Sequence, residues 1–219
     1  MSLSVIIPSR TASNLIPCVT AIQKLDPYVR VVVIDDGVER ENGKTLPVYS
    51  SKWIYGVSPF IFSRAINQGI QVTKGDVLLL NDDAILTTPG GFSLMQTAAN
   101  ERPQYGIISA TTNVTGNPAQ RPQGIGLRDE ARMVPFICVL IPRRTIEMVG
   151  LMDERYCIDY GCEDLDYCEA VRRAGLKIGI FDGCFVDHSS LRSTYRGDPH
   201  ATKDYSQNYE LYKKKWGIF

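Results

Sequence analysis

The chain has 219 residues, of which 44% are hydrophobic, and this is enough to bury the core of one fairly large domain. Its 24 basic residues balance its 24 acidic residues, so the formal net charge is zero. This balance argues against a protein whose main role is to coat nucleic acid or anionic lipid through bulk charge, although it is compatible with a local basic patch.

Strands and helices alternate along the sequence, a pattern typical of an α/β fold in which helices cover a mostly parallel central sheet. The predicted strands cover residues 3–8, 29–34, 52–57, 77–80, 105–110, 136–141 and 177–181. The predicted helices cover residues 13–25, 59–73, 89–100, 163–174 and 205–216. No internal repeat or low-complexity linker divides the chain, so we expect a single domain.

Residues 111–133 form a polar stretch with glycine and proline that is too long for a passive connection. It carries Arg121, Arg128 and Arg132, which would let it close over a substrate and exclude water. The alternative, that this stretch is a disordered surface loop, stays equally open.

The sequence carries no recognisable secretion or membrane signal. Met1 leads almost directly into an apolar strand, with no basic region and no cleavage site. The longest apolar stretch, residues 134–141, is far shorter than the roughly 20 residues of a spanning helix. The six cysteines include no C-x-x-C pair, which argues against a zinc cluster. Because nothing else in the sequence is typical of a secreted protein, we expect reduced structural thiols in a cytoplasmic protein.

Acidic and amide side chains follow two of the predicted strands. Asp35 and Asp36 end one strand, and Asn81, Asp82 and Asp83 end another. Ligands of open α/β sheets bind at the carboxyl ends of the strands, and clustered acids repel one another unless a cation or hydrogen-bond donors separate them. Helix caps and turns are the alternative explanation for each group, but two groups together favour a binding site.

A third acidic group, Glu163, Asp164 and Asp166, opens a predicted helix. The helix dipole favours ionised carboxylates there, and a general base must be ionised, so Glu163 or Asp164 suits that role. Residues two apart point to nearly opposite faces of a helix, so Asp164 and Asp166 cannot both face one ligand. We therefore expect Asp166 to be structural.

His188 follows the end of an apolar strand. A lone histidine is usually a satisfied polar group, and that alternative stays open here. His188 would otherwise join Asp83 on a divalent cation, and such a mixed ligand set suits Mn²⁺ better than Ca²⁺. The second histidine, His200, has no such setting and is assigned no role.

Several short motifs occur in a characteristic order. They occupy residues 4–10, 33–37, 62–70, 80–83, 150–154, 163–166 and 172–175. This ordered series resembles the family 2 glycosyltransferases of GT-A fold, over roughly residues 3–190. The resemblance implies a Rossmann-like catalytic domain, with a nucleotide-binding part near residues 1–110 and an acceptor-binding part near residues 111–219.

The resemblance also implies which residues hold a nucleotide-diphosphate sugar as donor. The expected donor-binding set is Pro8, Ser9, Arg10, Asp35, Asp36, Arg64, Asn67, Asn81 and Asp82. Residues 81–83 resemble the D-x-D metal motif, imperfectly because the first position is asparagine. Its last acid, Asp83, would bind Mn²⁺ or Mg²⁺, and His188 would complete the metal site.

Catalysis is expected at Glu163 and Asp164, because they resemble the acceptor-activating pair of this family. Asp164 would be the base of an inverting transfer, and the cation would offset the charge that develops on the leaving nucleoside diphosphate. The segment 160–164 is closer to the W-G-G-E-D segment of galactosyltransferase-like enzymes than to the spacing of rhamnosyltransferases.

Two other function classes stay open. A nucleotidyltransferase that makes sugar nucleotides would show a glycine-rich loop after the first strand, and residues 8–13 contain no glycine. A non-catalytic sugar-nucleotide-binding module would keep the fold but has no need of Asp83, Asp164 and His188.

The acceptor is expected to be soluble: a small glycoside, a protein or a modified nucleobase in DNA. The cluster 213–215 of three lysines, interleaved with Tyr209, Tyr212 and Trp216, would contact phosphate and bases. The alternative is a solvated helix end whose aromatic side chains pack on the core. The sequence leaves the oligomeric state open.

Overall fold

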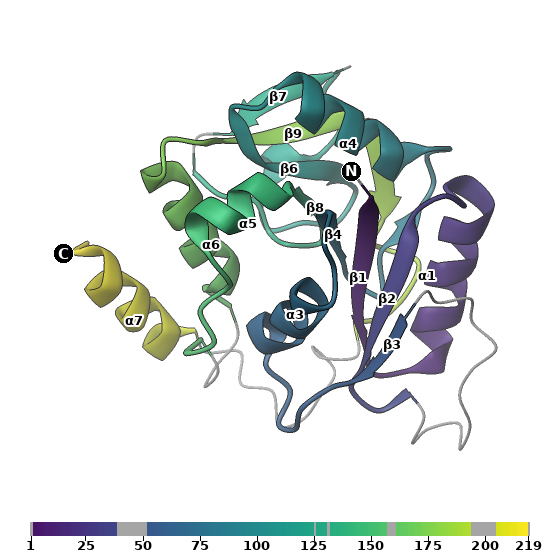
Figure 1. Cartoon of the computed structure of the whole chain (residues 1–219), viewed down its shortest axis with the longest axis horizontal. Helices are drawn as coiled ribbons and strands as arrows, with labels where there is room; N and C mark the ends of the chain where they lie inside the picture. The colour runs from purple at the N-terminus through teal and green to yellow at the C-terminus, as the bar shows by residue number, and fades with distance from the viewer. Residues whose placement is uncertain are drawn as a thin grey trace.

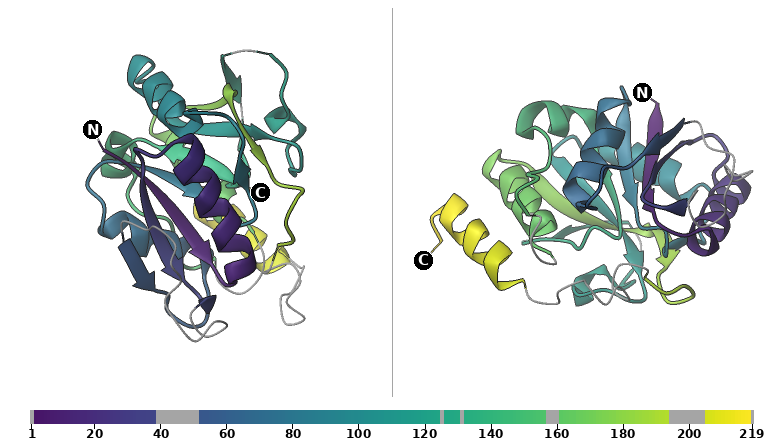
Figure 2. Two further views of the ribbon diagram at one scale, coloured as in Figure 1. Left: turned by 90° about the vertical axis from the view of Figure 1, so that its right-hand side faces the viewer. Right: turned by 90° about the horizontal axis from the view of Figure 1, so that it is seen from below.

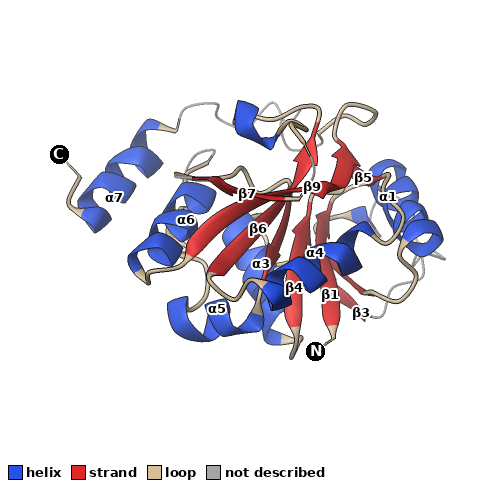
Figure 3. Ribbon diagram, turned by 90° about the horizontal axis from the view of Figure 1, so that it is seen from above, coloured by secondary structure: helices blue, strands red, loops and turns tan. Residues whose placement is uncertain are grey.

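A twisted sheet runs through the middle of the molecule, and helices pack on both of its sides (Figures 1 and 3). The computed structural model describes residues 2–38, 52–124, 126–130, 132–156, 161–193 and 205–218. His200, Tyr160 and Cys157 lie outside the described residues.

The sheet has the strand order β3-β2-β1-β4-β8-β6-β9-β5, and β7 pairs with β9 beside this path. The strands are β1 (Leu3–Ser9), β2 (Arg30–Asp35), β3 (Lys52–Tyr55), β4 (Asp76–Leu80), β5 (Ile85–Leu86), β6 (Tyr105–Thr112), β7 (Leu127–Glu130), β8 (Cys138–Ile141) and β9 (Lys177–Asp187). β1 lies between β2 and β4, so the ends of the first and fourth strands are neighbours.

The α/β fold is confirmed, but the sheet is mixed rather than mostly parallel. Among the described strands, β1–β2, β2–β3, β1–β4 and β6–β9 pair in parallel, whereas β4–β8, β6–β8, β5–β9 and β7–β9 are antiparallel. In the first half, one helix connects β1 to β2 and another connects β3 to β4, which is the strand–helix–strand pattern in which a crossover helix returns the chain parallel. Between β6 and β8 no α-helix intervenes among the described residues, so the chain returns antiparallel.

Two apolar layers cover the two faces of the sheet. One layer holds α1 (Ala12–Leu25) and α4 (Gly91–Glu101) against side chains such as Val5 and Ile7. The other holds α3 (Phe62–Gln71), α5 (Arg143–Val149) and α6 (Glu163–Arg173) against side chains such as Ile6. This alternation along β1 follows from the two-residue period of a strand that is buried on both faces.

The described part of the 111–133 segment is structured rather than a disordered loop. It contains a short 3-10 helix, η1 (Pro118–Gln120), and β7. Arg128 donates to the buried Asp182 of β9 at 3.1 Å and to the Ala119 carbonyl at 3.0 Å. Arg128 therefore ties this segment to the sheet, which differs from the substrate-closing role considered for it.

Helix α7 (Ser206–Trp216) lies beside α6 at the outer side of the molecule (Figure 2). Tyr212 and Trp216 pack with Tyr156 and Cys162 in a small apolar cluster. The second alternative for the lysine-rich segment, in which its aromatic side chains pack on the core, therefore holds only in part: Tyr212 and Trp216 pack inward in a separate cluster, whereas Tyr209 is exposed. Among the described helices, none combines the length and the apolar character needed to cross a bilayer.

Candidate active site

A pocket of about 550 Å³ opens at the carboxyl ends of β1 and β4 and is closed on another side by the start of α6. It brings together seven of the predicted site residues, namely Pro8, Asn81, Asp82, Asp83, Glu163, Asp164 and His188. The acidic groups at residues 81–83 and 163–164 therefore share one cavity, as does the histidine that follows β9.

Ser9 and Arg10 lie next to this pocket. Ser9 is fully buried, and its hydroxyl donates to Asp82 Oδ2 at 2.6 Å. Arg10 Nε lies 3.0 Å from Asp36 Oδ2, which joins the loops that follow β1 and β2. Ser9 thus supports a residue that lines the pocket.

Asp35 shapes a turn. Its Oδ1 accepts hydrogen bonds from the backbone N–H groups of Gly37 and Val38, at 2.7 and 2.6 Å, and its Oδ2 accepts one from Trp53 Nε1 at 3.3 Å. The turn explanation therefore fits Asp35, as strand-end aspartates often satisfy nearby backbone donors. The structure places Asp35 and Asp36 beside the pocket and not in its lining.

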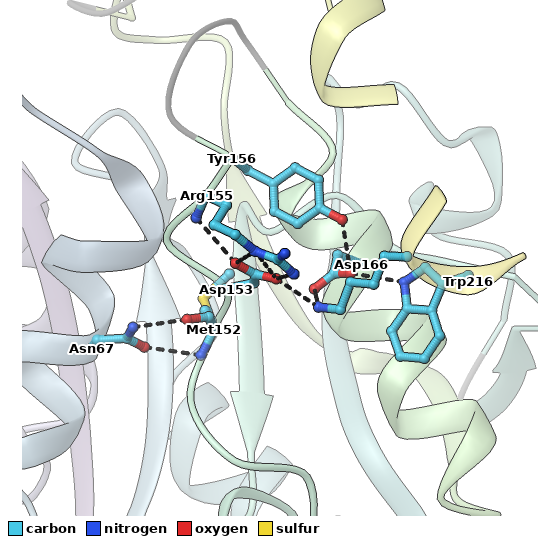
Figure 4. A network of polar contacts seen from close by, with 8 residues as sticks. Asn67, Met152, Asp153, Arg155, Tyr156, Asp166 and Trp216 are labelled. Carbon is cyan, nitrogen blue, oxygen red and sulfur yellow. Dashed lines mark hydrogen bonds and ion pairs between the residues drawn. The ribbon is translucent and has the colours of Figure 1, made fainter. Parts of the chain in front are cut away.

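Arg64 and Asn67 also lie away from the pocket lining. The Arg64 guanidinium donates to the Pro59 carbonyl at 2.7 Å. Asn67 is clamped to the backbone of Met152, with its amide nitrogen 2.9 Å from the carbonyl and its amide oxygen 3.0 Å from the N–H (Figure 4). These contacts favour a structural role for both residues over contact with a donor.

Asp82 is buried and lines the pocket together with Asp83. It accepts hydrogen bonds from Ser9 and, at 3.4 Å, from Asn14. Burial raises the pKa of Asp82 to about 6, and the neighbouring charge of Asp83 adds to the rise, while the bond from Ser9 opposes it. Positive charge brought into the pocket would therefore be favoured here.

His188 faces Asp83 across a short gap. Its Nε2 lies 3.1 Å from Asp83 Oδ1, and its Nδ1 lies 2.9 Å from the Val114 carbonyl oxygen. A carbonyl only accepts, so Nδ1 carries a proton, and a neutral imidazole then turns its unprotonated Nε2 towards a carboxylate. Two electron pairs at this distance repel, so the pair requires either a proton or a metal cation between them.

The donor set fits a divalent metal. A carboxylate oxygen and an imidazole nitrogen suit Mn²⁺, and both side chains are less than a tenth exposed. Within the described part of the chain, no group of three or more histidine, cysteine, aspartate or glutamate side chains is arranged to hold a metal. Among the described residues, Asp83 and His188 are therefore a candidate pair of metal ligands and not a complete set.

Glu163 and Asp164 stand at the start of α6, after a strained turn. Gly161 and Cys162 have φ values of +89° and +77°, and Cys162 is the non-glycine residue with positive φ among the described residues. Burial raises the pKa of both carboxyl groups, and the charge of Asp164 raises that of Glu163 further. The Leu165 N–H, 2.7 Å from Asp164 Oδ1, stabilises the ionised form of Asp164 and opposes the effect of burial on its pKa.

The third acid of this helix takes the structural position expected from helical spacing. Asp166 is buried and accepts hydrogen bonds from Tyr156, Lys215 and Trp216 (Figure 4). It does not line the pocket.

Aromatic side chains complete the pocket wall and were not singled out in the sequence. Phe60, Phe62, Phe136, Tyr156 and Tyr205 all line it. Phe62 carries only the helical apolar period, which equally describes a core residue. No local pattern therefore separates these aromatic residues from ordinary core positions.

Residues 4–153 match the sequence profile of Glycosyl transferase family 2. The chain belongs to this family. Because the match covers more than half of the chain, the resemblance noted in the sequence is confirmed, and glycosyltransferase is the enzyme class of the family.

Solved structures of GT-A glycosyltransferases share the fold at low sequence identity. GalNAc-T7 with UDP, GalNAc and Mn²⁺ has a TM-score of 0.70 and 15% identity, over 86% of this chain and 44% of that one. A mannosyltransferase from Pyrobaculum calidifontis in complex with GDP-Man and Mn²⁺ has a TM-score of 0.66 and 14% identity, over 88% of this chain and 58% of that one. TarS from S. aureus has a TM-score of 0.63 and 14% identity, over 90% and 63%.

The present chain thus spans between 44% and 63% of the length of these three proteins. At these identities the likeness establishes the fold. No curated protein sequence matches the chain.

Proposed function

We propose that this protein transfers a sugar from a nucleotide-diphosphate sugar to an acceptor hydroxyl, with inversion at the anomeric carbon and with the help of a divalent metal. The observation that carries the proposal is the shared pocket of Asp83, His188 and Asp164. A metal-binding pair on one side and a base on the other are the two parts that such a displacement needs.

Asp83 and His188 would hold Mn²⁺ or Mg²⁺. The Nε2 to Oδ1 approach of 3.1 Å, which requires a cation or proton, supports this assignment. Mn²⁺ is also present in the solved complexes of GalNAc-T7 and of the mannosyltransferase. When bound, the metal would offset the negative charge on the departing nucleoside diphosphate.

Asp164 would take the proton from the acceptor hydroxyl as that oxygen attacks the anomeric carbon. The new bond forms on the face opposite the diphosphate while the bond to the diphosphate breaks, so one displacement inverts the centre. A base works best when its pKa lies near the working pH, and burial moves the pKa of Asp164 in that direction. Glu163 lines the same pocket, and burial raises its pKa; in its protonated form it would donate a hydrogen bond to the acceptor.

The donor would lie along the ends of β1 and β4, where Pro8, Asn81 and Asp82 line the pocket. Arg10 and Asp36 border this end of the sheet and would contact the nucleotide. A cytoplasmic location and a soluble acceptor (a glycoside, a protein or a modified nucleobase in DNA) remain part of the proposal.

The test is sugar transfer by Asp164→Asn. Removing the base should lower transfer from a sugar nucleotide by a factor of about 100 or more, because general base catalysis contributes 10²–10⁴-fold. Donor affinity in the presence of Mn²⁺ should stay within twofold, as the donor lies at the strand ends. Asp129→Asn, a half-exposed acid on β7, is the matched control. Full turnover by Asp164→Asn would disprove the base assignment.

The two other function classes have distinct outcomes in the same assays. Release of pyrophosphate from a nucleoside triphosphate would identify a nucleotidyltransferase. Donor binding without hydrolysis or transfer, over a panel of donors and acceptors with Mn²⁺, would identify a binding module.

A further inference from the structure

We propose that α7 positions the catalytic base: Asn208, Lys215 and Trp216 hold the first turn of α6 and thereby orient Asp164. The inference rests on the role proposed for Asp164. The three side chains do not line the pocket, so they would act through the turn and not on the substrate.

The first contact holds the turn that precedes the acidic pair. Asn208 is 1% exposed, and its Nδ2 donates to the Gly161 carbonyl at 3.0 Å. Gly161 and Cys162 both have positive φ, and a cysteine in that conformation is strained. Such a turn persists only when its surroundings hold it, and Asn208 supplies one of the holding bonds.

The second contact holds the other side of the same turn. Asp166 accepts hydrogen bonds from Trp216 Nε1 at 2.8 Å and from Lys215 Nζ at 2.7 Å (Figure 4). The Asp166 N–H donates in turn to the Cys162 carbonyl at 2.9 Å, which closes the first turn of the helix. Side chains of α7 therefore bond to the backbone of Gly161, which precedes Asp164, and to the side chain of Asp166, which follows it.

The same hydrogen-bond network reaches the wall of the pocket. Lys215 Nζ also lies 2.9 Å from Asp153 Oδ2, and Tyr156, which lines the pocket, donates to Asp166 Oδ1 at 2.9 Å. Met152, next in sequence to Asp153, is clamped by Asn67 of α3 (Figure 4). One polar network thus joins α3, the 152–156 segment, α6 and α7.

These contacts are concentrated at the active-site turn rather than spread over the core. Among the described residues, neither of the two apolar layers on the sheet contains a residue of α7. The apolar contacts of α7 lie in the small cluster with Tyr156 and Cys162. A helix that served only to complete the core would be expected to pack into one of the main layers.

The test uses Asn208→Leu and Trp216→Phe, singly and together, which remove the donors while keeping much of the apolar volume. The double variant should lose kcat by a factor of about 10 or more, with donor KM within twofold, because the donor-side residues belong to the sheet. Lys215→Met should act in the same direction, and Lys215→Arg should restore most of the turnover. Lys214→Met, at an exposed neighbour on the same helix, is the matched control.

Hydrogen–deuterium exchange gives a readout that needs no turnover. Peptides covering residues 161–165 should exchange faster in the double variant than in the wild type or Lys214→Met, while peptides of α4 should be unchanged. Unchanged exchange at 161–165, or a kcat within twofold of the wild type, would overturn the inference. A wild-type protein that transfers no sugar would instead count against the proposed function, and the exchange experiment would still decide the positioning.

Discussion

The imidazole of His188 is held in place from a distant part of the chain. Asn113 Oδ1 accepts from the His188 N–H at 2.9 Å, and Asn113 Nδ2 donates to Asp187 Oδ1 at 2.7 Å. The Val114 carbonyl fixes the ring through Nδ1. A ligand that is oriented by a second hydrogen bond binds metal more tightly, so in the proposed metal site these bonds would contribute to metal affinity.

Asn113→Ala should weaken Mn²⁺ affinity by less than the 10–100-fold that is typical of partners bonded to a ligating ring, because Asn113 holds the backbone of His188 and not its imidazole. Calorimetric titration of Mn²⁺ in the presence of a nucleoside diphosphate measures this affinity. Asn100→Ala, at an exposed position of α4, is the control. The same Mn²⁺ affinity in Asn113→Ala and in the wild type would show that the hydrogen bonds of Asn113 do not set the position of the ligand.

Glu163 should make the stability of the protein depend on pH. Burial, followed by the charge of Asp164, raises the pKa of Glu163 in the folded chain above its value in the unfolded chain. The protonated form then stabilises the fold at low pH, and this contribution is lost as the pH rises through the raised pKa. As the pH rises above the ordinary pKa range of glutamate, the free energy of unfolding of the wild type should therefore fall relative to that of Glu163→Gln. Denaturant titrations across pH measure it, and a constant difference between the two proteins would refute it.

Helix α3 packs unusually close to the central strand. A Cβ built on Gly69 would lie 2.5 Å from Ile6 Cγ2, a contact that a real Cβ does not make. The glycine therefore lets α3 approach β1 closely enough to place Phe62, in its first turn, at the wall of the pocket. The geometry of one helix on the sheet thus contributes to the shape of the site.

Gly69→Ala should lower the free energy of unfolding by about 1–3 kcal/mol, the usual effect of overpacking a core. Chemical denaturation measures the change. Ile6→Ala removes all three atoms that the added Cβ would meet, so Gly69→Ala should cost less stability in the Ile6→Ala background than in the wild type. Gly124→Ala, where an added Cβ has no atom within 4 Å, should be close to neutral. Equal stability of Gly69→Ala and the wild type would mean that α3 can shift away at no cost.

The whole molecule is two half-sheets joined at one antiparallel pairing. β4 pairs in parallel with β1 and antiparallel with β8, so it lies between the parallel first half and the mixed second half. Asp82 and Asp83 follow β4 directly, whereas Glu163 and Asp164 begin a helix of the second half. The pocket therefore lies where the two halves meet, and a ligand bound in it would contact both halves.

Binding across this junction should stabilise the entire fold. Mn²⁺ with a nucleoside diphosphate, at about 100 times the dissociation constant, should raise the free energy of unfolding by about 2.7 kcal/mol, because the ligands bind only the folded chain. Thermal unfolding with and without EDTA measures the metal-dependent part. Asp83→Asn should abolish most of this metal-dependent stabilisation, whereas Asp129→Asn should retain it. An equal metal-dependent stabilisation of the two variants would show that Asp83 does not bind the metal.

The sequence alone determined the order of the longer strands and helices, since apolar side chains repeat with the period of each of these elements. It also placed acids at the ends of two strands and at the start of α6, and the helical period separated Asp166 from Asp164. Helix α5 and the short strands β5 and β7 were not predicted, because each is too short for its apolar side chains to show a recognisable period.

Only the tertiary structure decided that Asp83, His188 and Asp164 share a pocket, that Asn67 clamps Met152, and that α7 holds the turn before Glu163. It also decided the direction of β8, which made the sheet mixed. The physical reason is range. Periodicity and capping act over a few neighbouring residues, whereas strand pairing and helix packing bring together groups about 30 or more positions apart, through contacts that no local pattern records.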